Sequence, residues 1–447
     1  MRLLLSTSLA ALQPARTAAL LLLAACCAGQ AATAAAQGRP AAKPVAGSTS
    51  YATRADAMQF ADEVAARRGL DRNWVRATIG AARFLPNVPR LMLPGPTGTV
   101  KNWQAYRGRF IDATRIAAGV RFWRANADTL ARAEATYGVP PEIVVGIVGV
   151  ETIYGRNMGN FRVIDALATL AFDFPQAHPR AADRQAFFRS ELESFLSTES
   201  RTADDPLVLL GSYAGAMGMP QFMPSSIARY AVDFDGDGRI DLVNNPADVI
   251  GSVASYFKAF GWKAGMPATY PVHFDEARLR KDVLLAPDIV PSFSADSFVA
   301  AGAVPEGDGL RHKGLLALIE LQNGLDAPPT YVAGTRNFYV VTRYNWSSYY
   351  AMSVLDLGQE VKAAMGLVPA TSPVLPQPAQ SSQPLEPLQS PQSPQSLPPL
   401  QPAAPVQLPS PQPLQPQPLQ PLQPEPSPQQ PTQQQPSQQR EPMPLPE

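Results

Sequence analysis

The feature that most constrains the fold is the run IVVGIVGV at residues 143–150, which carries no polar side chain. A helix that is apolar on every face is buried among other elements. Pro140 and Pro141 precede the run and suit the first turn of a helix. Gly146 and Gly149 have no side chain, so neighbouring backbone can approach closely. The sequence therefore predicts a central buried helix with other elements packed around it.

Helical patterns recur on both sides of this run. RADAMQFADEVAARRG predicts an amphipathic helix ending at Gly69, and DRNWVRATIGAARFL predicts a second helix with Asp71 as its N-cap. DATRIAAGVRFWRANADTLARAEATYG predicts one long helix closed by Gly138, and NPADVIGSVASYFKAFGW predicts a helix from about Pro246 to Gly261. Strand-like pieces are few, the best being ELQNG and NFYVVTRY. We expect a mainly α fold with a small, irregular β-containing insertion.

The two ends differ in composition from the middle of the chain. Residues 1–36 have early arginines and the apolar stretch TAALLLLAACCAG, which is typical of an export signal and too short for a comfortable membrane span. The tail at 370–447 consists largely of Pro, Gln, Ser and Leu, and such a segment cannot bury enough apolar surface to fold. The tail is interpreted as a disordered, solvated segment, with a spacer or a ligand for SH3-type domains as the alternative. One folded domain, with or without a small lobe, is therefore expected at residues 50–367.

Cysteine usage bears on the location of the mature chain. The two cysteines, Cys26 and Cys27, both lie in the predicted signal. LAAC, ending at Cys26, resembles a bacterial lipobox, so lipidated Cys26 would begin an outer-membrane-anchored lipoprotein of the periplasm of a Gram-negative bacterium. Alternatively, ATAAA at residues 32–36 is an ordinary cleavage site that releases a soluble periplasmic protein, and the cysteines are simply part of the apolar stretch.

Charge excludes some classes of partner. Lys plus Arg number 37 and Asp plus Glu number 37, so the formal net charge is zero. This balance gives no electrostatic reason to expect nucleic acid or an anionic membrane surface as partner.

Glu151 follows directly after the apolar run. Desolvation there would raise the pKa of its carboxyl, and a carboxylic acid that stays protonated near neutral pH can act as a general acid. The alternatives are a structural Glu satisfied by backbone or by Arg156, and a side chain exposed beyond the helix end. Downstream, the loop in GSYAGAMGMPQFMPSSIARY brings small residues and neutral hydrogen-bonding groups together, and NFYVVTRYNWSSYY combines aromatic rings with amides. Such groups suit a carbohydrate ligand, although each segment alone also fits core packing.

Four segments together resemble the bacterial lytic transglycosylase B family. They are VPPEIVVGIVGVETIYGRNMGNFRVIDALATLAFDFP, GSYAGAMGMPQFMPSSIARYAVDFDGDG, IGSVASYFKAFGW and NFYVVTRYN, in the order of the family. The likeness runs from about Tyr106 to about Lys362. It implies a lysozyme-like helical fold with a groove for peptidoglycan glycan strands. It also implies non-hydrolytic cleavage of the β-1,4 bond between N-acetylmuramic acid and N-acetylglucosamine, which leaves 1,6-anhydromuramoyl ends.

The resemblance assigns both proton transfers to Glu151. Ordinary glycosidases use two carboxyls, and the sequence offers no second acid of comparable apolar surroundings with a plausible groove position, because Asp165 and Asp173 look like helix-surface or capping groups. A lysozyme-type hydrolase and a non-catalytic peptidoglycan-binding scaffold remain as alternatives. Cell-wall synthesis or division proteins would be the partners of the tail. By position, the resemblance adds groove residues that contact the glycan: Ser212, Gln221, Tyr344, Asn345, Tyr350, Tyr106, Tyr256 and Arg184.

The segment DFDGDGRIDLVN at 233–244 fits an EF-hand-like loop. Position 6 is Gly238, where the loop turns sharply, and three aspartates packed this closely repel unless a cation neutralises them. We expect structural Ca²⁺ and no organic cofactor, with a solvated Asp-Gly turn as the alternative. Position 12 holds an Asn in place of the usual Glu, so Asn245 or Asp248 could take its role. The predicted ligands are Asp233, Asp235, Asp237, the Arg239 carbonyl and Asn244.

Overall fold

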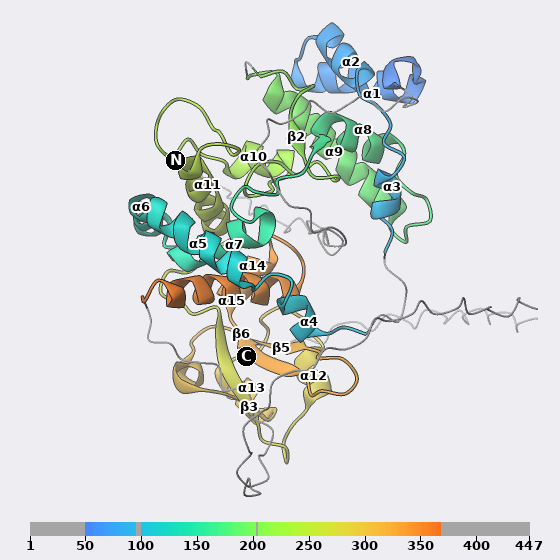
Figure 1. Cartoon of the computed structure of the whole chain (residues 1–447). Helices are drawn as coiled ribbons and strands as arrows, with labels where there is room; N and C mark the ends of the chain where they lie inside the picture. Colours follow the sequence, from blue (N-terminus) through green and yellow to red (C-terminus); the bar gives the residue numbers. More distant parts are fainter. Residues whose placement is uncertain (1–49, 95–99, 203, 368–447) are drawn as a thin grey trace, which may run out of the picture. The chain divides into compact units, whose positions relative to one another are not determined.

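The computed structural model describes residues 50–94, 100–202 and 204–367 (Figure 1). The predicted signal, Cys26 and the Pro/Gln-rich tail lie outside the described residues. Within the described part of the chain, no helix combines the length and apolar character needed to cross a membrane.

Helix α7 (Pro141–Thr152) is the central element that the apolar run predicts. It packs along α15 (Ser348–Ala364), and the approach is so close that a Cβ on Gly146 would collide with the carbonyl oxygen of Val354. The same is true in reverse, since a Cβ on Gly358 would meet the carbonyl oxygen of Glu142. Glycine is therefore required on both helices where the two backbones meet.

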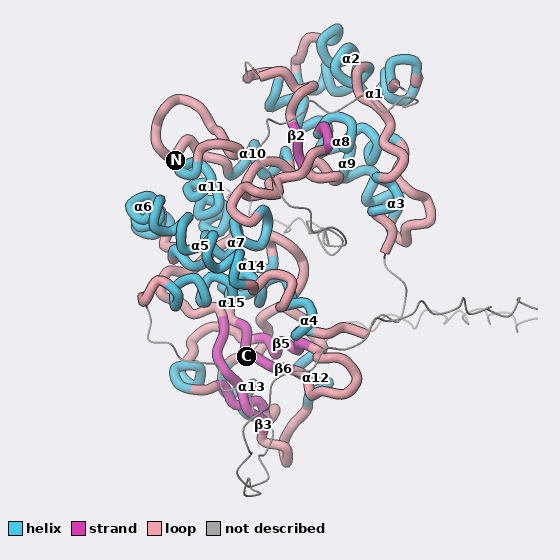
Figure 2. The backbone as a smooth tube through the Cα atoms, viewed as in Figure 1, coloured by secondary structure: helices cyan, strands magenta, loops and turns pink. Residues whose placement is uncertain are grey.

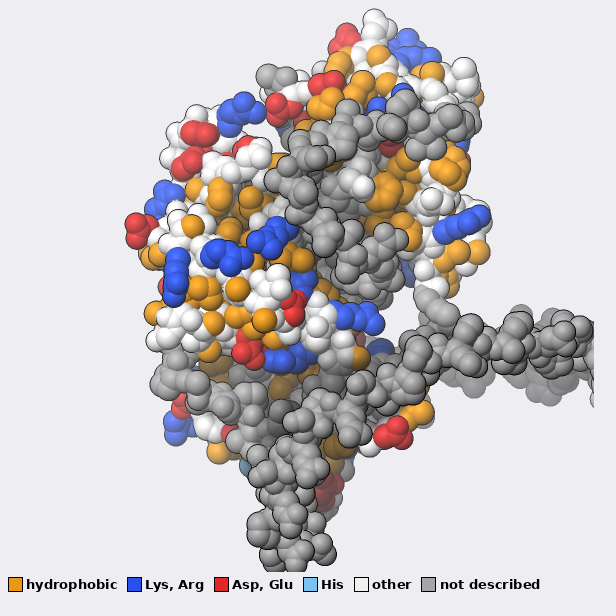
Figure 3. Space-filling model, viewed as in Figure 1, with side chains coloured by type: hydrophobic (Ala, Val, Ile, Leu, Met, Phe, Trp, Pro, Cys, Tyr) orange, Lys and Arg blue, Asp and Glu red, His pale blue; other side chains and the backbone are white. Residues whose placement is uncertain are grey.

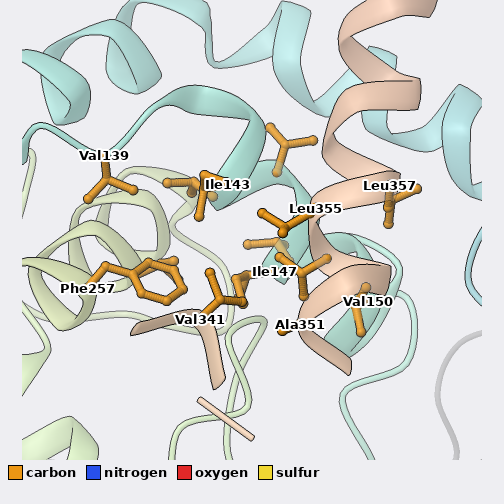
Figure 4. Close-up of a cluster of buried hydrophobic side chains, with 14 of the residues drawn as sticks. Val139, Ile143, Ile147, Val150, Phe257, Val341, Ala351, Leu355 and Leu357 are labelled. Carbon is orange, nitrogen blue, oxygen red and sulfur yellow. The ribbon is translucent and has the colours of Figure 1, made fainter. Parts of the chain in front are cut away.

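Several helices surround this pair and complete its core. They are α4 (Trp103–Arg107), α5 (Ala113–Ala125), α6 (Ala127–Tyr137), α11 (Pro246–Ala259) and α14 (Arg336–Thr342). Figure 4 shows apolar side chains from α7, α11, α14 and α15 meeting in one cluster, among them Ile143, Ile147, Phe257, Val341 and Leu355. Burial of such a cluster is the main stabilising contribution to this part of the fold.

A second core lies under the N-terminal helices. It joins α1 (Ala55–Arg68), α2 (Arg72–Gly80), α3 (Val88–Leu91), α8 (Val163–Phe172) and α9 (Ala181–Glu199), with α8 packed on α9 and α1 on α2. The short strands β1 (Phe161–Arg162) and β2 (Leu210–Gly211) pair beside it, and α10 (Pro224–Tyr230) packs against α9. A short 3₁₀ helix at Tyr51–Thr53 precedes α1.

The predicted β-containing insertion is a four-stranded antiparallel sheet, coloured magenta in the lower part of Figure 2. Its strand order is β4-β3-β6-β5, and its pairing places Tyr270 opposite Ala333 and Ile319 opposite Val332. Its elements are β3 (Thr269–Phe274), α12 (Lys281–Leu285), α13 (Ala295–Ala300), β4 (Ala303–Pro305), a 3₁₀ helix (Gly307–Arg311), β5 (Ala317–Leu321) and β6 (Thr330–Gly334). The mainly helical fold class with a small sheet is thereby confirmed.

Two predicted elements are wrong. The predicted long helix is interrupted at Asn126, whose φ of −124° and ψ of 23° lie outside the helical range. Its side-chain amide donates to the carbonyl oxygen of Phe122 at 2.8 Å, in addition to the backbone N–H of Asn126. The segment NFYVVTRY, predicted as a strand, forms α14 after Thr335 caps its N-terminus by accepting from the backbone of Asn337. Short apolar runs rich in β-branched residues do not distinguish a strand from a buried helix. By contrast, ELQNG does contribute Glu320 and Leu321 to β5.

Charge is distributed over the surface in both signs. Figure 3 shows basic side chains in blue and acidic side chains in red on the same face of the described residues, among apolar and uncharged groups. This mixture agrees with the balanced composition of the chain.

Candidate active site

Glu151 lies in the last turn of α7, where the chain leaves the core. The helix ends at Thr152, and Ile153 then adopts a left-handed conformation with φ of 53°. This conformation is costly for a β-branched residue, so surrounding contacts must hold it. The Thr152 hydroxyl supplies one such contact by donating to the carbonyl oxygen of Met219 at 2.9 Å. The helix end is thereby tied to the loop that precedes Gln221.

The carboxyl of Glu151 is almost completely enclosed, with 8% of the residue exposed. The Tyr350 hydroxyl donates to Oε1 at 2.5 Å, while Oε2 has no hydrogen-bond partner among the described residues. Burial raises the pKa of Glu151 to about 7, against the smaller opposing effect of the Tyr350 hydrogen bond. The group can therefore lose and regain a proton near neutral pH, and one of its oxygens is left for a ligand.

Glu151 lines a pocket of about 400 Å³. Its walls come from the turn after α7, the loop around Ser212, α9, α10, α11 and the segment after α14. Besides Glu151, the residues that line this pocket include Ser212, Gln221, Tyr256, Tyr344, Glu191, Arg229, Tyr230, Phe260 and Arg343.

Four residues predicted to contact glycan line this pocket with Glu151. Gln221 has a positive φ of 51°, and its amide nitrogen donates to the carbonyl oxygens of Met158 and Gly218, which fixes the side chain. The rings of Tyr256 and Tyr344 lie 4.9 Å apart, and both hydroxyls donate to backbone carbonyl oxygens. Ser212 Oγ accepts from the backbone of Ala216 at 3.0 Å. The pocket thus presents fixed aromatic and neutral polar groups, as a carbohydrate site requires.

The structure places the other predicted contact residues differently. Tyr350 is 1% exposed and reaches Glu151 from within the core, and Asn345 is buried and does not line the pocket. Tyr106 packs with aromatic neighbours including Tyr349, at 5.7 Å between ring centroids, and lies outside the pocket lining. Arg184 is buried on α9 and also lies outside the lining. None of these four residues lines the pocket, and their contact with glycan stays a prediction.

Sequence reasoning missed Glu191, a second buried carboxyl that lines the pocket. It is 1% exposed, and burial raises its pKa. Its two oxygens accept from the backbone N–H and the hydroxyl of Ser225, at 2.8 and 2.7 Å. The statement that no second acid shares the surroundings of Glu151 is thus wrong. The missed signal is helical spacing, because Glu191 stands three residues after Phe188 and four before Phe195 on the buried face of α9.

Asp165 and Asp173 are the two other acids for which the sequence predicts a surface or capping position. Asp165 was expected at a surface or a cap, but it is buried and accepts from Arg162 at 2.8 Å and from the backbone of Arg83. Asp173 does end α8 as a cap residue, and Arg54 pairs with it at 2.6 Å. Neither lines the pocket of Glu151.

The aspartate loop gathers three carboxylates, with ligand atoms of Asp233, Asp235 and Asp248 within 4.8 Å of one another. Carboxylate oxygens at this separation suit a hard divalent cation such as Ca²⁺. The expected ligand Asn244 instead directs its amide to Asp241 at 3.1 Å. Asp237 is not part of the cluster, and its carboxylate accepts from the backbone of Arg239. Asp248, from the first turn of α11, lies with Asp233 and Asp235 in this cluster.

Comparison with known proteins identifies the family to which the chain belongs. Residues 52–359 match the family described as Transglycosylase SLT domain. Membrane-bound lytic murein transglycosylase B of Escherichia coli (strain K12) is 41% identical over 323 residues, covering 70% of this chain and 84% of that protein. The chain belongs to the lytic transglycosylase family. It is an enzyme that acts on the glycan strands of peptidoglycan, as the resemblance implied, and the non-catalytic alternative is set aside.

Two solved structures of lytic transglycosylases share the fold of this transglycosylase. Slt35 of Escherichia coli in complex with calcium aligns with a TM-score of 0.61 and 42% identity, over 71% of this chain and 95% of that one. SltB3 of Pseudomonas aeruginosa in complex with NAG-anhNAM-pentapeptide aligns with a TM-score of 0.56 and 29% identity, over 68% and 79%. The lysozyme-like helical fold that the resemblance implies for this chain is thereby confirmed.

Proposed function

We propose that Glu151 carries both proton transfers of a non-hydrolytic cleavage between N-acetylmuramic acid and N-acetylglucosamine. The protonated carboxyl gives its proton to the glycosidic oxygen as the bond from C1 of the muramoyl residue to that oxygen breaks. The carboxylate then takes the proton of the muramoyl 6-hydroxyl as this oxygen bonds to C1. Glu151 is left protonated again, no water is consumed, and the product has a 1,6-anhydromuramoyl end.

The observation that carries this proposal is the pairing of a pKa of about 7 with one oxygen of Glu151 that has no hydrogen-bond partner in the described part of the chain. A group used as acid and then as base works best when its pKa lies near the operating pH. The Tyr350 hydroxyl steadies the carboxylate form between the two steps. Ser212, Gln221 and Tyr344 would position the sugar, and its own N-acetyl group would support positive charge at C1.

One observation favours a second candidate, a lysozyme-type hydrolase. Glu191 is a buried carboxyl in the same pocket, as two-carboxyl glycosidases require. Both of its oxygens, however, are held by Ser225, so the side chain acts as the anchor of α10 rather than as a base for water. We therefore assign Glu191 the role of holding α10 in position.

Product analysis tests the reaction. Mass spectrometry of soluble fragments from purified sacculi should show 1,6-anhydro ends, one water lighter than reducing ends. The Glu151→Gln variant should release them about 10²–10⁴-fold more slowly. Reducing ends from the wild type would establish the hydrolase, and near-normal release by the variant would remove Glu151 from the mechanism.

We also propose structural Ca²⁺ bound by Asp233, Asp235 and Asp248, with the backbone carbonyl of Arg239 as a further ligand. Support comes from the grouped carboxylates and from the calcium complex of the related Slt35. The ion would join the loop to the start of α11, which bears the pocket residue Tyr256.

Finally, we propose that lipidated Cys26 anchors the enzyme in the outer membrane, facing the periplasm. Support comes from LAAC and from the membrane-bound relative. Mass spectrometry of the mature N-terminus should find a diacylated, N-acylated Cys26, and Cys26→Ala should move the enzyme to the soluble fraction. An unmodified N-terminus near Gln37 would contradict the anchor. The tail at 370–447 remains a candidate contact for cell-wall synthesis or division proteins.

A further inference from the structure

The active-site pocket contains charges that the acid–base mechanism does not use. Besides Glu151 and Glu191, its charged lining residues are Arg229 and Arg343. We propose that these two arginines bind a carboxylate of the substrate, carried either by the stem peptide or by the free lactyl group of N-acetylmuramic acid. The inference rests on the proposed function and adds an anion-recognition subsite to it.

Among the described residues, no carboxylate lies within ion-pair distance of Arg229 or Arg343, although many other arginines of the chain have such a partner. Glu191 feels the charge of Arg229, but its oxygens are directed to Ser225. Two cations in the wall of a ligand pocket, without acidic partners, form a site for an anion.

Arg343 is held in place by its neighbours. Its guanidinium carbon lies 4.9 Å from the ring centroid of Trp346 and 5.5 Å from that of Tyr339, whose hydroxyl it also contacts at 3.3 Å. Its backbone carbonyl accepts the hydroxyl of Tyr256 at 2.7 Å. A guanidinium stacked on rings keeps its edge donors available, and loses less rotamer freedom when it binds a carboxylate.

Phe260 lies against Arg343 and against Tyr230, the neighbour of Arg229 in the sequence. Its ring lies 5.8 Å from the guanidinium carbon of Arg343 and 5.5 Å from the ring of Tyr230, the residue after Arg229. Arg229 itself is exposed in the last turn of α10, a helix fixed at its start by Glu191. Both arginines therefore line the same pocket as Tyr230 and Phe260.

The chemistry of the substrate determines which group such a subsite takes. The sugar rings and N-acetyl groups of peptidoglycan are neutral, and they need aromatic faces and neutral hydrogen-bonding groups. The lactyl group, when free, and the stem peptides, when attached, carry carboxylates. Guanidinium groups bind carboxylates through two parallel hydrogen bonds, which gives direction as well as charge. The arginines would thus distinguish muramoyl residues from uncharged glycans.

The test compares Arg229→Gln and Arg343→Gln with the control Arg121→Gln, which alters an exposed arginine of α5 outside the pocket. Soluble glycan strands bearing stem peptides serve as substrate, and a neutral oligomer of N-acetylglucosamine serves as binding probe. Each pocket variant should raise KM for the strands about tenfold, the effect of one charge-assisted interaction, and more than it lowers kcat. The affinity for the neutral oligomer should stay within twofold in all three variants.

Strands stripped of their stems by an amidase separate the two carboxylate sources. On strands with stems the lactyl carboxyl is an amide, so a rise in KM there reports a carboxylate of the stem peptide. An equal rise on stripped strands, where the amidase has freed the lactyl carboxylate, would show that the subsite also takes that group, and no rise on stripped strands would show that it takes the stem carboxylate alone. Arg229→Lys and Arg343→Lys should recover part of the affinity. An unchanged KM in both glutamine variants, or an equal loss of affinity for the neutral oligomer, would overturn the subsite. A wild type that makes reducing ends would instead refute the proposed reaction, independently of these affinities.

Discussion

The Tyr350 hydroxyl donates a 2.5 Å hydrogen bond to Oε1 of Glu151 from a helix 199 residues further along the chain. Burial and the neighbouring Glu151 raise the pKa of Tyr350 well above its usual value, so the phenol stays protonated and keeps donating. The bond favours the carboxylate over the carboxylic acid. It therefore sets the balance between the acid and base forms of a group that must serve as both.

Tyr350→Phe should shift the pH dependence of the enzyme. Without the hydrogen bond the pKa of Glu151 rises above about 7, so the alkaline limb of kcat/KM moves to higher pH. We expect kcat/KM near neutral pH to fall about tenfold, because the carboxylate formed in the first step is less stable. The control Tyr349→Phe alters a hydroxyl that contacts Gln322 and should leave the limb in place. An alkaline limb that does not move in Tyr350→Phe would disconnect this bond from the titration.

The burial of Glu151 should be measurable as a pH-dependent cost to stability. Its folded pKa of about 7 lies above the unfolded value of 4.5, so its stability contribution is fully present below pH 4.5 and lost as pH rises through 7. Glu151→Gln lacks this titration. Its free energy of unfolding, relative to wild type, should therefore increase by about 3 kcal/mol between pH 4.5 and pH 8. Denaturant unfolding at several pH values provides the measurement, and a constant difference would contradict the raised pKa.

Arg184 offers a test of an unpaired buried cation. The residue is 8% exposed, its Nε has no hydrogen-bond partner among the described residues, and burial lowers the pKa of its guanidinium to about 10. Arg184→Met keeps the apolar stem and removes the charge, so we expect the free energy of unfolding to rise by about 1 kcal/mol. Arg180→Met, at a more exposed side chain paired with Asp183, should change it by less than about 0.5 kcal/mol. A lower free energy of unfolding for Arg184→Met would show that the contacts of Arg184 with aromatic rings outweigh the cost of desolvating its charge. A raised KM of the variant would show that Arg184 contributes to substrate binding.

Some parts of the candidate site could be predicted from the sequence and others could not. The position and burial of Glu151 follow from local pattern, because an all-apolar helix has to be buried and its last turn remains attached to it. The hydrogen-bond partner of Glu151 was not predicted, because no local pattern relates residues 199 positions apart. The resemblance offered Tyr350 only as a residue that contacts glycan. Glu191 was missed for a related reason, since its role depends on Ser225 of a helix packed across it. The sequence offered Asp248 only as an alternative for position 12, because its place beside Asp233 and Asp235 depends on how the chain turns into α11.

Calcium should stabilise the enzyme through the loop that carries Asp233. When the free calcium concentration is about one hundred times the Kd, one bound ion adds about 2.7 kcal/mol to the free energy of unfolding, which corresponds to a rise in Tm of about 5 °C. Removal of calcium with a chelator should lower Tm by that amount, and readdition should restore it. Asp248→Asn removes a carboxylate of the cluster and should abolish the response, whereas Asp326→Asn, at an exposed loop position, should retain it. A wild type whose Tm ignores chelation and readdition, or a response that survives in Asp248→Asn, would show that these carboxylates do not hold the ion.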